Sequence, residues 1–226
     1  MRTPDRFRVL LLAGVETRYH AYEEVVPPLT ACLGSLGVSC ACELPAQALS
    51  RDRLKASDAI VSITTGGQLT PVQEQALLSA IRTPTNDRNR PVHFLGLHGA
   101  ACSFSNSPAY YEMLGGRFAG HPPMATFRVS VSEKHPVTER VSGFDIFEEL
   151  YTLKLCAPVQ VLLTGTSKTS LDGAPQLPLG WVKHYGAGKV CYLALGHGAR
   201  QLEHQSVQRL VENTLAWFGL GNGQRL

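Results

Sequence analysis

Residues 92–99 read Val92-His93-Phe94-Leu95-Gly96-Leu97-His98-Gly99, and this stretch decides the fold class. Its largely apolar first half predicts a buried strand. The two glycines that flank Leu97 and His98 predict a sharp turn with one polar side chain at its apex. A strand followed by such a turn is the layout of the nucleophile elbow in α/β enzymes. Because the apex is His98 rather than serine or cysteine, the turn favours general acid/base chemistry or metal binding over acyl transfer.

Strands and helices alternate in the part of the chain that precedes this elbow. Apolar strands are expected over 7–13, 38–42, 59–63 and 92–95, and helices from about Pro28 to Leu36 and from Thr70 to Arg82. The second helix has strong start chemistry, because Thr70 can cap it and Gln73 completes a capping box. This order predicts an α/β fold with a doubly wound, mainly parallel sheet.

The second half of the chain reads differently and adds antiparallel strands. A short helix is expected over 107–114, a C-terminal helix over 207–218, and strands over 126–132, 144–155, 159–165, 180–185 and 189–195. The turn Tyr185-Gly186-Ala187-Gly188 predicts that the last two strands form a hairpin. An exposed edge of that hairpin could pair with a second copy in a homodimer. Residues 167–176 are expected to form a mobile loop.

Bulk composition bounds the class of protein. With 226 residues, 44% hydrophobic and 17% charged, the chain suits one domain spanning 1–226, with its core over about 7–219. The net charge is only +3 and no basic block stands out, so neither a nucleic acid nor a membrane surface is an expected partner.

Cysteine usage and the start of the chain indicate the compartment. The six cysteines form no CxxC pair and most lie in apolar runs, which indicates free thiols in a reducing environment. The apolar run Val9–Ala13 is too short for a signal peptide core or a membrane span. We therefore expect a cytoplasmic protein.

Polar side chains follow several of the expected parallel strands. His20 follows the first strand, Thr64–Gly67 the third, His98 the fourth and His197 the last. In open α/β sheets the ligand site lies beyond the carboxyl ends of the strands, so these residues can meet at one edge. His121 lies in a loop shortly after the elbow. Each could instead be an ordinary turn or surface residue, and His121 before Pro122 is the most ambiguous.

Two adjacent acids, Glu148 and Glu149, fall inside an expected strand. Neighbouring strand residues point to opposite faces, so only one of the two is expected to face the site. Glu149 would be costly to bury without a partner, which could be a histidine, a metal ion or an arginine such as Arg117.

Together these segments resemble the trehalose-utilisation (ThuA-like) family. The segments that carry the resemblance are Leu69–Gln73, Phe94–Ala100, Pro108–Pro122, His135–Thr138, Phe147–Tyr151 and Trp181–Gly198. The elbow is similar to the family's GLHAA motif and Phe147–Tyr151 to its DELY motif. The resemblance extends from about Val9 to Phe218. It implies a class I glutamine amidotransferase-like fold, which is a flavodoxin-like arrangement, and a role in carbohydrate metabolism on a disaccharide or keto-sugar derivative.

The resemblance also implies that glutaminase activity is absent, because the elbow lacks a cysteine and Cys102 lies past the apex. Our first hypothesis is a sugar-processing enzyme in which His98, His121, Glu149 and His197 are catalytic. In this hypothesis His98, His121 and His197 could hold a divalent ion such as zinc or manganese. The substrate, a small sugar, would contact His20, Thr65, Gly66 and Tyr151. No nucleotide cofactor is expected.

Two other functions remain open at this point. The first is a non-catalytic sugar-binding or regulatory protein in which Tyr110, Tyr111, Tyr151 and Trp181 could stack on sugar rings. The second is a hydrolase with Cys102 or Ser103 as nucleophile, which is disfavoured because neither residue occupies the turn apex.

Overall fold

The computed structural model describes residues 6–14, 19–167 and 176–220, and a nine-stranded sheet forms its centre. The strand order is β2-β1-β3-β4-β11-β10-β9-β6-β7. The first five are parallel: β2 (Ser39–Glu43), β1 (Arg8–Leu12), β3 (Ala59–Ser62), β4 (His93–Leu97) and β11 (Gly188–Leu193). The antiparallel part comprises β10 (Leu177–Tyr185), β9 (Gln160–Ser167), β6 (Ala125–Val131) and β7 (Phe144–Glu148). The fold is the α/β class expected from the sequence, with a mainly parallel sheet extended by antiparallel strands.

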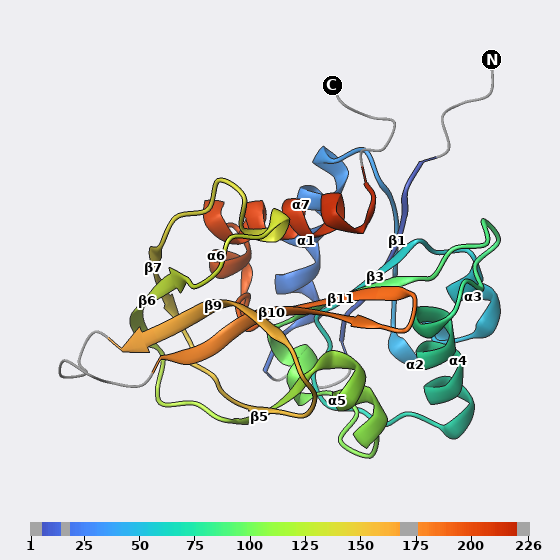
Figure 1. Ribbon diagram of the computed structural model, residues 1–226, viewed down its shortest axis with the longest axis horizontal. Helices are drawn as coiled ribbons and strands as arrows, with labels where there is room; N and C mark the ends of the chain where they lie inside the picture. The colour runs from blue at the N-terminus through green and yellow to red at the C-terminus, as the bar shows by residue number, and fades with distance from the viewer. Residues whose placement is uncertain (1–5, 15–18, 168–175, 221–226) are drawn as a thin grey trace.

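Helices cover both faces of the sheet, which explains why its central strands are apolar throughout. Figure 1 shows α1 (Tyr22–Ser35), α6 (Ala199–Leu202) and α7 (Gln205–Phe218) on one side. On the other side lie α4 (Pro71–Arg82) and α5 (Pro108–Leu114). The shorter helices are α2 (Pro45–Ala48), α3 (Arg51–Lys55) and two 3-10 helices, His98–Cys102 and Pro136–Thr138. Among the described residues, no helix has both the length and the apolar composition needed to cross a membrane.

Local start signals predicted one long helix accurately and misplaced the start of another. Helix α4 begins at Pro71 with the expected capping box between Thr70 and Gln73. Helix α1 begins at Tyr22 and carries Pro27 and Pro28 inside it, so the expected start near Pro28 is wrong. Its buried side chains recur at helical spacing through the prolines, from Val25 to Leu33. Burial of this face therefore outweighs the preference of proline for the first turn.

The segment 144–155 is not one strand, as expected, but two. Strand β7 ends at Glu148, and β8 (Thr152–Leu155) belongs to a separate two-stranded sheet. Its partner there is β5 (Gly116–Gly120), which the sequence did not reveal. Residues 149–151 lie between the two sheets. Their side chains therefore need not alternate between two faces as they would in a continuous strand.

The expected hairpin of β10 and β11 is present, but its edges are not free. Strand β10 also pairs with β9, and β11 with β4, so the outer strands of the sheet are β2 and β7. The expectation of an exposed hairpin edge is therefore wrong. Residues 168–175, most of the segment expected to be a mobile loop, lie outside the described residues. All six cysteines are free thiols.

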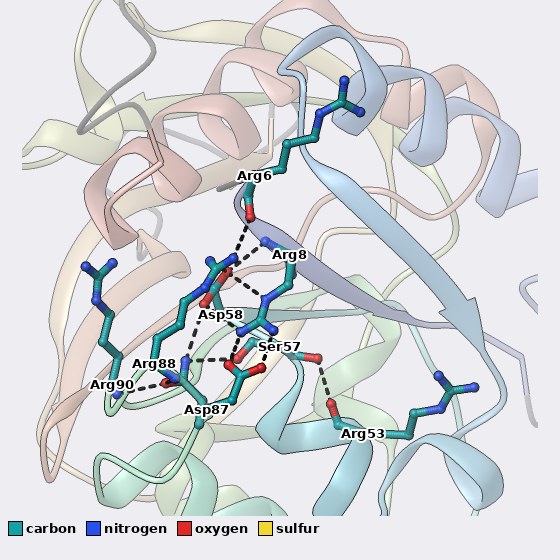
Figure 2. Close-up of polar contacts among 9 residues, drawn as sticks. Arg6, Arg8, Arg53, Ser57, Asp58, Asp87, Arg88 and Arg90 are labelled. Atoms are coloured by element: carbon teal, nitrogen blue, oxygen red, sulfur yellow. Dashed lines mark hydrogen bonds and ion pairs between the residues drawn. The ribbon is translucent and has the colours of Figure 1, made fainter. Parts of the chain in front are cut away.

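An ion-pair network fastens the amino-terminal ends of the parallel strands (Figure 2). The buried carboxylate of Asp58, just before β3, accepts hydrogen bonds from the Arg8 backbone N–H (2.9 Å) and from Arg88 Nη1 (2.5 Å). The Arg8 guanidinium also contacts Asp87 Oδ2 at 2.7 Å. The network ties the start of β1 to the start of β3 and to the loop before β4. It lies at the end of the sheet away from the polar residues that follow these strands.

Candidate functional site

Four loops meet at the carboxyl ends of neighbouring strands. His20 lies between β1 and α1, Thr65 follows β3, His98 follows β4 and His197 follows β11. Because β1, β3, β4 and β11 are adjacent in the sheet, residues up to 177 positions apart come into contact. The edge is the one where doubly wound sheets bind ligands.

His98 occupies a strained turn, as the elbow motif predicted. Its φ is +37°, in the left-handed region that non-glycine residues rarely adopt. Gly96, two residues before it, is closely packed, because a Cβ there would lie 2.9 Å from Leu114 Cδ1. Such strain costs of order 1–3 kcal/mol and persists only where the surroundings enforce it. The side chain of His98 is fully buried beneath the other site residues.

The ring of His98 contacts four groups. Its Nδ1 lies 3.4 Å from the Ala194 carbonyl oxygen. Its Nε2 lies 2.9 Å from the Tyr151 hydroxyl, 3.3 Å from His197 Nδ1 and 3.3 Å from Glu149 Oε2. Since the carbonyl can only accept, Nδ1 carries the proton and the Nε2 lone pair points into the cluster.

His20 is oriented in a similar way by the Thr65 hydroxyl, which can accept a proton from its ring. Its Nδ1 lies 2.6 Å from Thr65 Oγ1, and its Nε2 lies 3.3 Å from His197 Nδ1. Burial, together with the charges of His98 and His197, lowers the pKa of His20 to about 3. His20 is therefore neutral near pH 7. Its side chain belongs to the cluster and also lines a cavity beside it.

Glu149 is surrounded by imidazoles. Its Oε2 lies 3.3 Å from both His98 Nε2 and His197 Nδ1, and its Oε1 lies 3.5 Å from His121 Nε2. Burial alone would raise its pKa, but the contact with His98 and the positive charge that His197, His98 and His121 can carry lower the pKa to about 2. The carboxylate is therefore ionised near pH 7.

Glu148 also serves the site, a role that the sequence did not reveal. Its side chain is fully buried, and its Oε2 accepts hydrogen bonds from the backbone N–H groups of Gly196 (2.9 Å) and His197 (3.1 Å). It thus holds the loop that carries His197. The alternation rule predicted that only one of the two acids would face the site. Of the two acids, only Glu149 lines the cavity and belongs to the cluster of imidazoles, whereas Glu148 is buried behind it.

His121 lies beside the cluster rather than in it. A group of four donors, from His20, His98, Glu149 and His197, has its ligand atoms within 4.8 Å of one another, and His121 is not among them. His121 is one-third exposed, and its Nδ1 lies 2.8 Å from the Pro122 carbonyl oxygen. The structure therefore places His20, expected to bind substrate, in the donor group, and places His121 one contact away.

A cavity of about 630 Å³ opens above these residues. Thr65 and Gly66 line it together with His121, Glu149 and His197. Tyr151 also reaches the cavity but is only 2% exposed, because its ring packs against His98 and Phe118. It offers its hydroxyl rather than a ring face. Tyr110 and Trp181, two other residues considered for sugar stacking, are fully buried.

The two nucleophile candidates are poorly placed for catalysis. Ser103 is fully buried, and its hydroxyl donates to the carbonyl oxygens of Thr64 (2.8 Å) and Gly99 (3.1 Å). Cys102 lines the cavity, but burial raises the pKa of its thiol to about 11, which leaves little reactive thiolate at neutral pH.

Comparison with known proteins identifies the family. The model of the ThuA family, described as trehalose utilisation, matches residues 8–218. The chain belongs to the ThuA family. This membership assigns it a role in carbohydrate metabolism. A search of curated proteins gave no match.

Solved structures agree with the ThuA fold. A ThuA-like protein from Parabacteroides merdae superposes with a TM-score of 0.79 at 15% identity, covering 98% of this chain and 93% of the other. One from Bacteroides uniformis gives a TM-score of 0.72 at 21% identity, covering 96% and 93%. A Thermoplasma acidophilum protein described as part of a GMP synthase gives 0.57 at 14% identity, covering 96% of each chain. At these identities the similarities establish the fold alone.

Proposed function

We propose that the protein is an enzyme that moves a proton on a disaccharide or keto-sugar derivative. One observation carries the proposal: imidazoles and a carboxylate from separate loops converge at a single cavity. The cavity volume of about 630 Å³ is within the usual range for small-molecule sites. Membership of the ThuA family supports a sugar as the substrate.

Within this proposal His121 is the residue that holds and moves the proton. Three imidazoles face Glu149, those of His98, His121 and His197. The side chain of His121 is the most exposed of the three, so it can exchange protons with solvent. Its Nδ1–H donates to the Pro122 carbonyl, and its Nε2 faces Glu149 Oε1. A carboxylate in this position stabilises an imidazolium that forms during the reaction.

Glu149 has the complementary role. A carboxylate with a pKa of about 2 is a weak base near pH 7, because general bases work best when their pKa lies near the operating pH. Glu149 is better suited to orient imidazoles and to balance their charge. Thr65 and Gly66, on the cavity wall, would contact sugar hydroxyls through the Thr65 side chain and the backbone.

Deuterium exchange tests the proposal directly. A keto derivative of trehalose, in which one ring hydroxyl is oxidised to a carbonyl, is incubated with the protein in D₂O. NMR follows deuterium incorporation at the carbon next to that carbonyl. We expect His121→Asn to slow this exchange by a factor of about 10²–10⁴, the usual contribution of a positioned acid or base. The matched control is His184→Asn, an exposed histidine remote from the cavity, which should leave the rate unchanged.

The alternative, a non-catalytic sugar-binding protein, gives a different result. It would bind trehalose or a related sugar in calorimetry, and it would catalyse no exchange in wild type or variant. That outcome would replace the proposed enzyme with a binding protein on the same scaffold.

A further inference from the structure

The donor atoms of His20, His98, His197 and Glu149 make more close contacts with one another than single protons and lone pairs can satisfy. His197 Nδ1 lies 3.3 Å from each of His20 Nε2, His98 Nε2 and Glu149 Oε2. A ring nitrogen can hold one proton or one lone pair, so it can satisfy one such contact. The Ala194 carbonyl oxygen and the Thr65 hydroxyl can accept the Nδ1 protons of His98 and His20, and in that tautomer both Nε2 lone pairs point towards His197 Nδ1. A cation at the centre would satisfy all four donors at once.

The spacing of these atoms is that of a tetrahedral metal site. Zinc binds imidazole nitrogen and carboxylate oxygen at about 2.0–2.2 Å, so donor atoms at the corners of a tetrahedron lie about 3.3–3.5 Å apart. Four of the six donor pairs are 3.3 Å apart. The remaining two pairs, both involving His20, are no more than 4.8 Å apart. Metal binding would bring His20 Nε2 closer to His98 Nε2 and Glu149 Oε2.

The surroundings hold the donors in place as metal sites require. His98 is fixed by the strained elbow, and the backbone of His197 is fixed by the buried carboxylate of Glu148. The Nδ1 contacts of His20 and His98 are outer hydrogen bonds of the kind that fix the tautomer of ligating histidines. Glu149 supplies the one negative charge of the donor set.

We propose that His20, His98, His197 and Glu149 bind one divalent ion of the zinc class. Three imidazoles and one carboxylate in tetrahedral spacing favour zinc or cobalt over magnesium, calcium or manganese, which prefer more oxygen ligands and higher coordination. This set differs from the one expected from the sequence, in which His121 was a ligand and His20 was not. The proposal concerns metal binding alone, so it stands whether or not the sugar chemistry proposed above is correct.

The first test uses the wild-type protein without any substrate. The full chain is stripped with a chelator, dialysed and titrated with Zn²⁺ in a calorimeter. We expect one ion per chain. Loading with Co²⁺ should give the intense visible absorption of tetrahedral cobalt. Absence of stoichiometric zinc binding, or the weak spectrum of six-coordinate cobalt, would overturn the proposal.

Variants then separate the two ligand sets. His20→Asn can still contact Thr65 but has no atom that reaches the centre, so we expect it to lose zinc binding. Glu149→Gln should also lose most of the affinity for zinc. This variant provides a second test if His20→Asn fails to fold. Thr65→Val keeps the imidazole but removes its outer hydrogen bond, and should weaken zinc binding about 10–100-fold.

His121→Asn is the decisive control, because it changes the neighbouring histidine and should leave zinc affinity unchanged. His184→Asn reports background binding by surface histidines. Loss of zinc in His121→Asn with retention in His20→Asn would refute the four-ligand set. Deuterium exchange on keto-glycosides is read separately, so failure of the enzyme proposal cannot be mistaken for failure of the metal proposal.

Discussion

His93 shows how one partly buried side chain sets a pH response away from the site. Its Nδ1 accepts a hydrogen bond from the Lys189 backbone N–H at 3.1 Å, and its ring packs against Phe218. Burial, together with the Lys189 charge, lowers its pKa from 6.5 to about 4. The unfolded chain therefore binds the proton first as the pH falls. The free energy of unfolding is therefore highest above about pH 6.5. It falls as the pH drops towards 4, by at most about 3 kcal/mol.

The variant His93→Asn isolates this effect. An asparagine amide oxygen can accept the same hydrogen bond but does not titrate. We expect the free energy of unfolding, measured by urea titration at pH 7, 6 and 5, to fall less steeply in the variant than in wild type. Equal slopes in the two proteins would show that His93 does not titrate as described.

The sequence predicted some site residues well and others poorly, for identifiable reasons. His98 could be placed because the glycines that create its turn are adjacent to it in sequence. Glu148 could not be assigned its role, since the end of β7 depends on β8 pairing with β5, over 30 residues away along the chain. His20 was expected only to contact substrate, because its place in the donor group depends on the tertiary fold, which brings Thr65 to its Nδ1.

At the scale of elements, the Asp58 network is expected to stabilise the sheet without influencing the site. Asp58→Asn removes the charge that pairs with Arg8 and Arg88, leaving two partly buried guanidinium groups undercompensated. We expect a loss of about 2–3 kcal/mol in the free energy of unfolding, somewhat less than for a fully buried pair because both arginines are partly exposed. Urea denaturation measures this loss.

The control for this change is Asp145→Asn, which removes an exposed pair with Arg128. It should cost less than about 1 kcal/mol. Zinc affinity should be the same in both variants, because the network and the donor group lie at opposite ends of the strands. A large change in zinc affinity in Asp58→Asn would show that the two ends are coupled.

The two halves of the molecule differ in how far local sequence determines them. The parallel half follows from alternating apolar strands and capped helices, each of which is a local signal. The antiparallel half depends on pairings such as β6 with β9 and β10 with β9, which no local pattern specifies. Similarly, the hairpin of β10 and β11 was predicted from its turn, but its place inside the sheet was not.

For the whole molecule, zinc binding should raise the stability of the fold. The proposed ligands come from loops that follow β1, β4, β7 and β11, so one ion would link both the parallel and the antiparallel parts of the sheet. The unfolded chain lacks this arrangement, and an ion that binds only the folded state at 100 times its Kd adds about 2.7 kcal/mol. Scanning calorimetry of stripped and zinc-loaded protein should therefore show a higher Tm with zinc. His121→Asn should keep this increase, and Glu149→Gln should lose most of it. An equal Tm with and without zinc would mean that the ion does not bind across these loops.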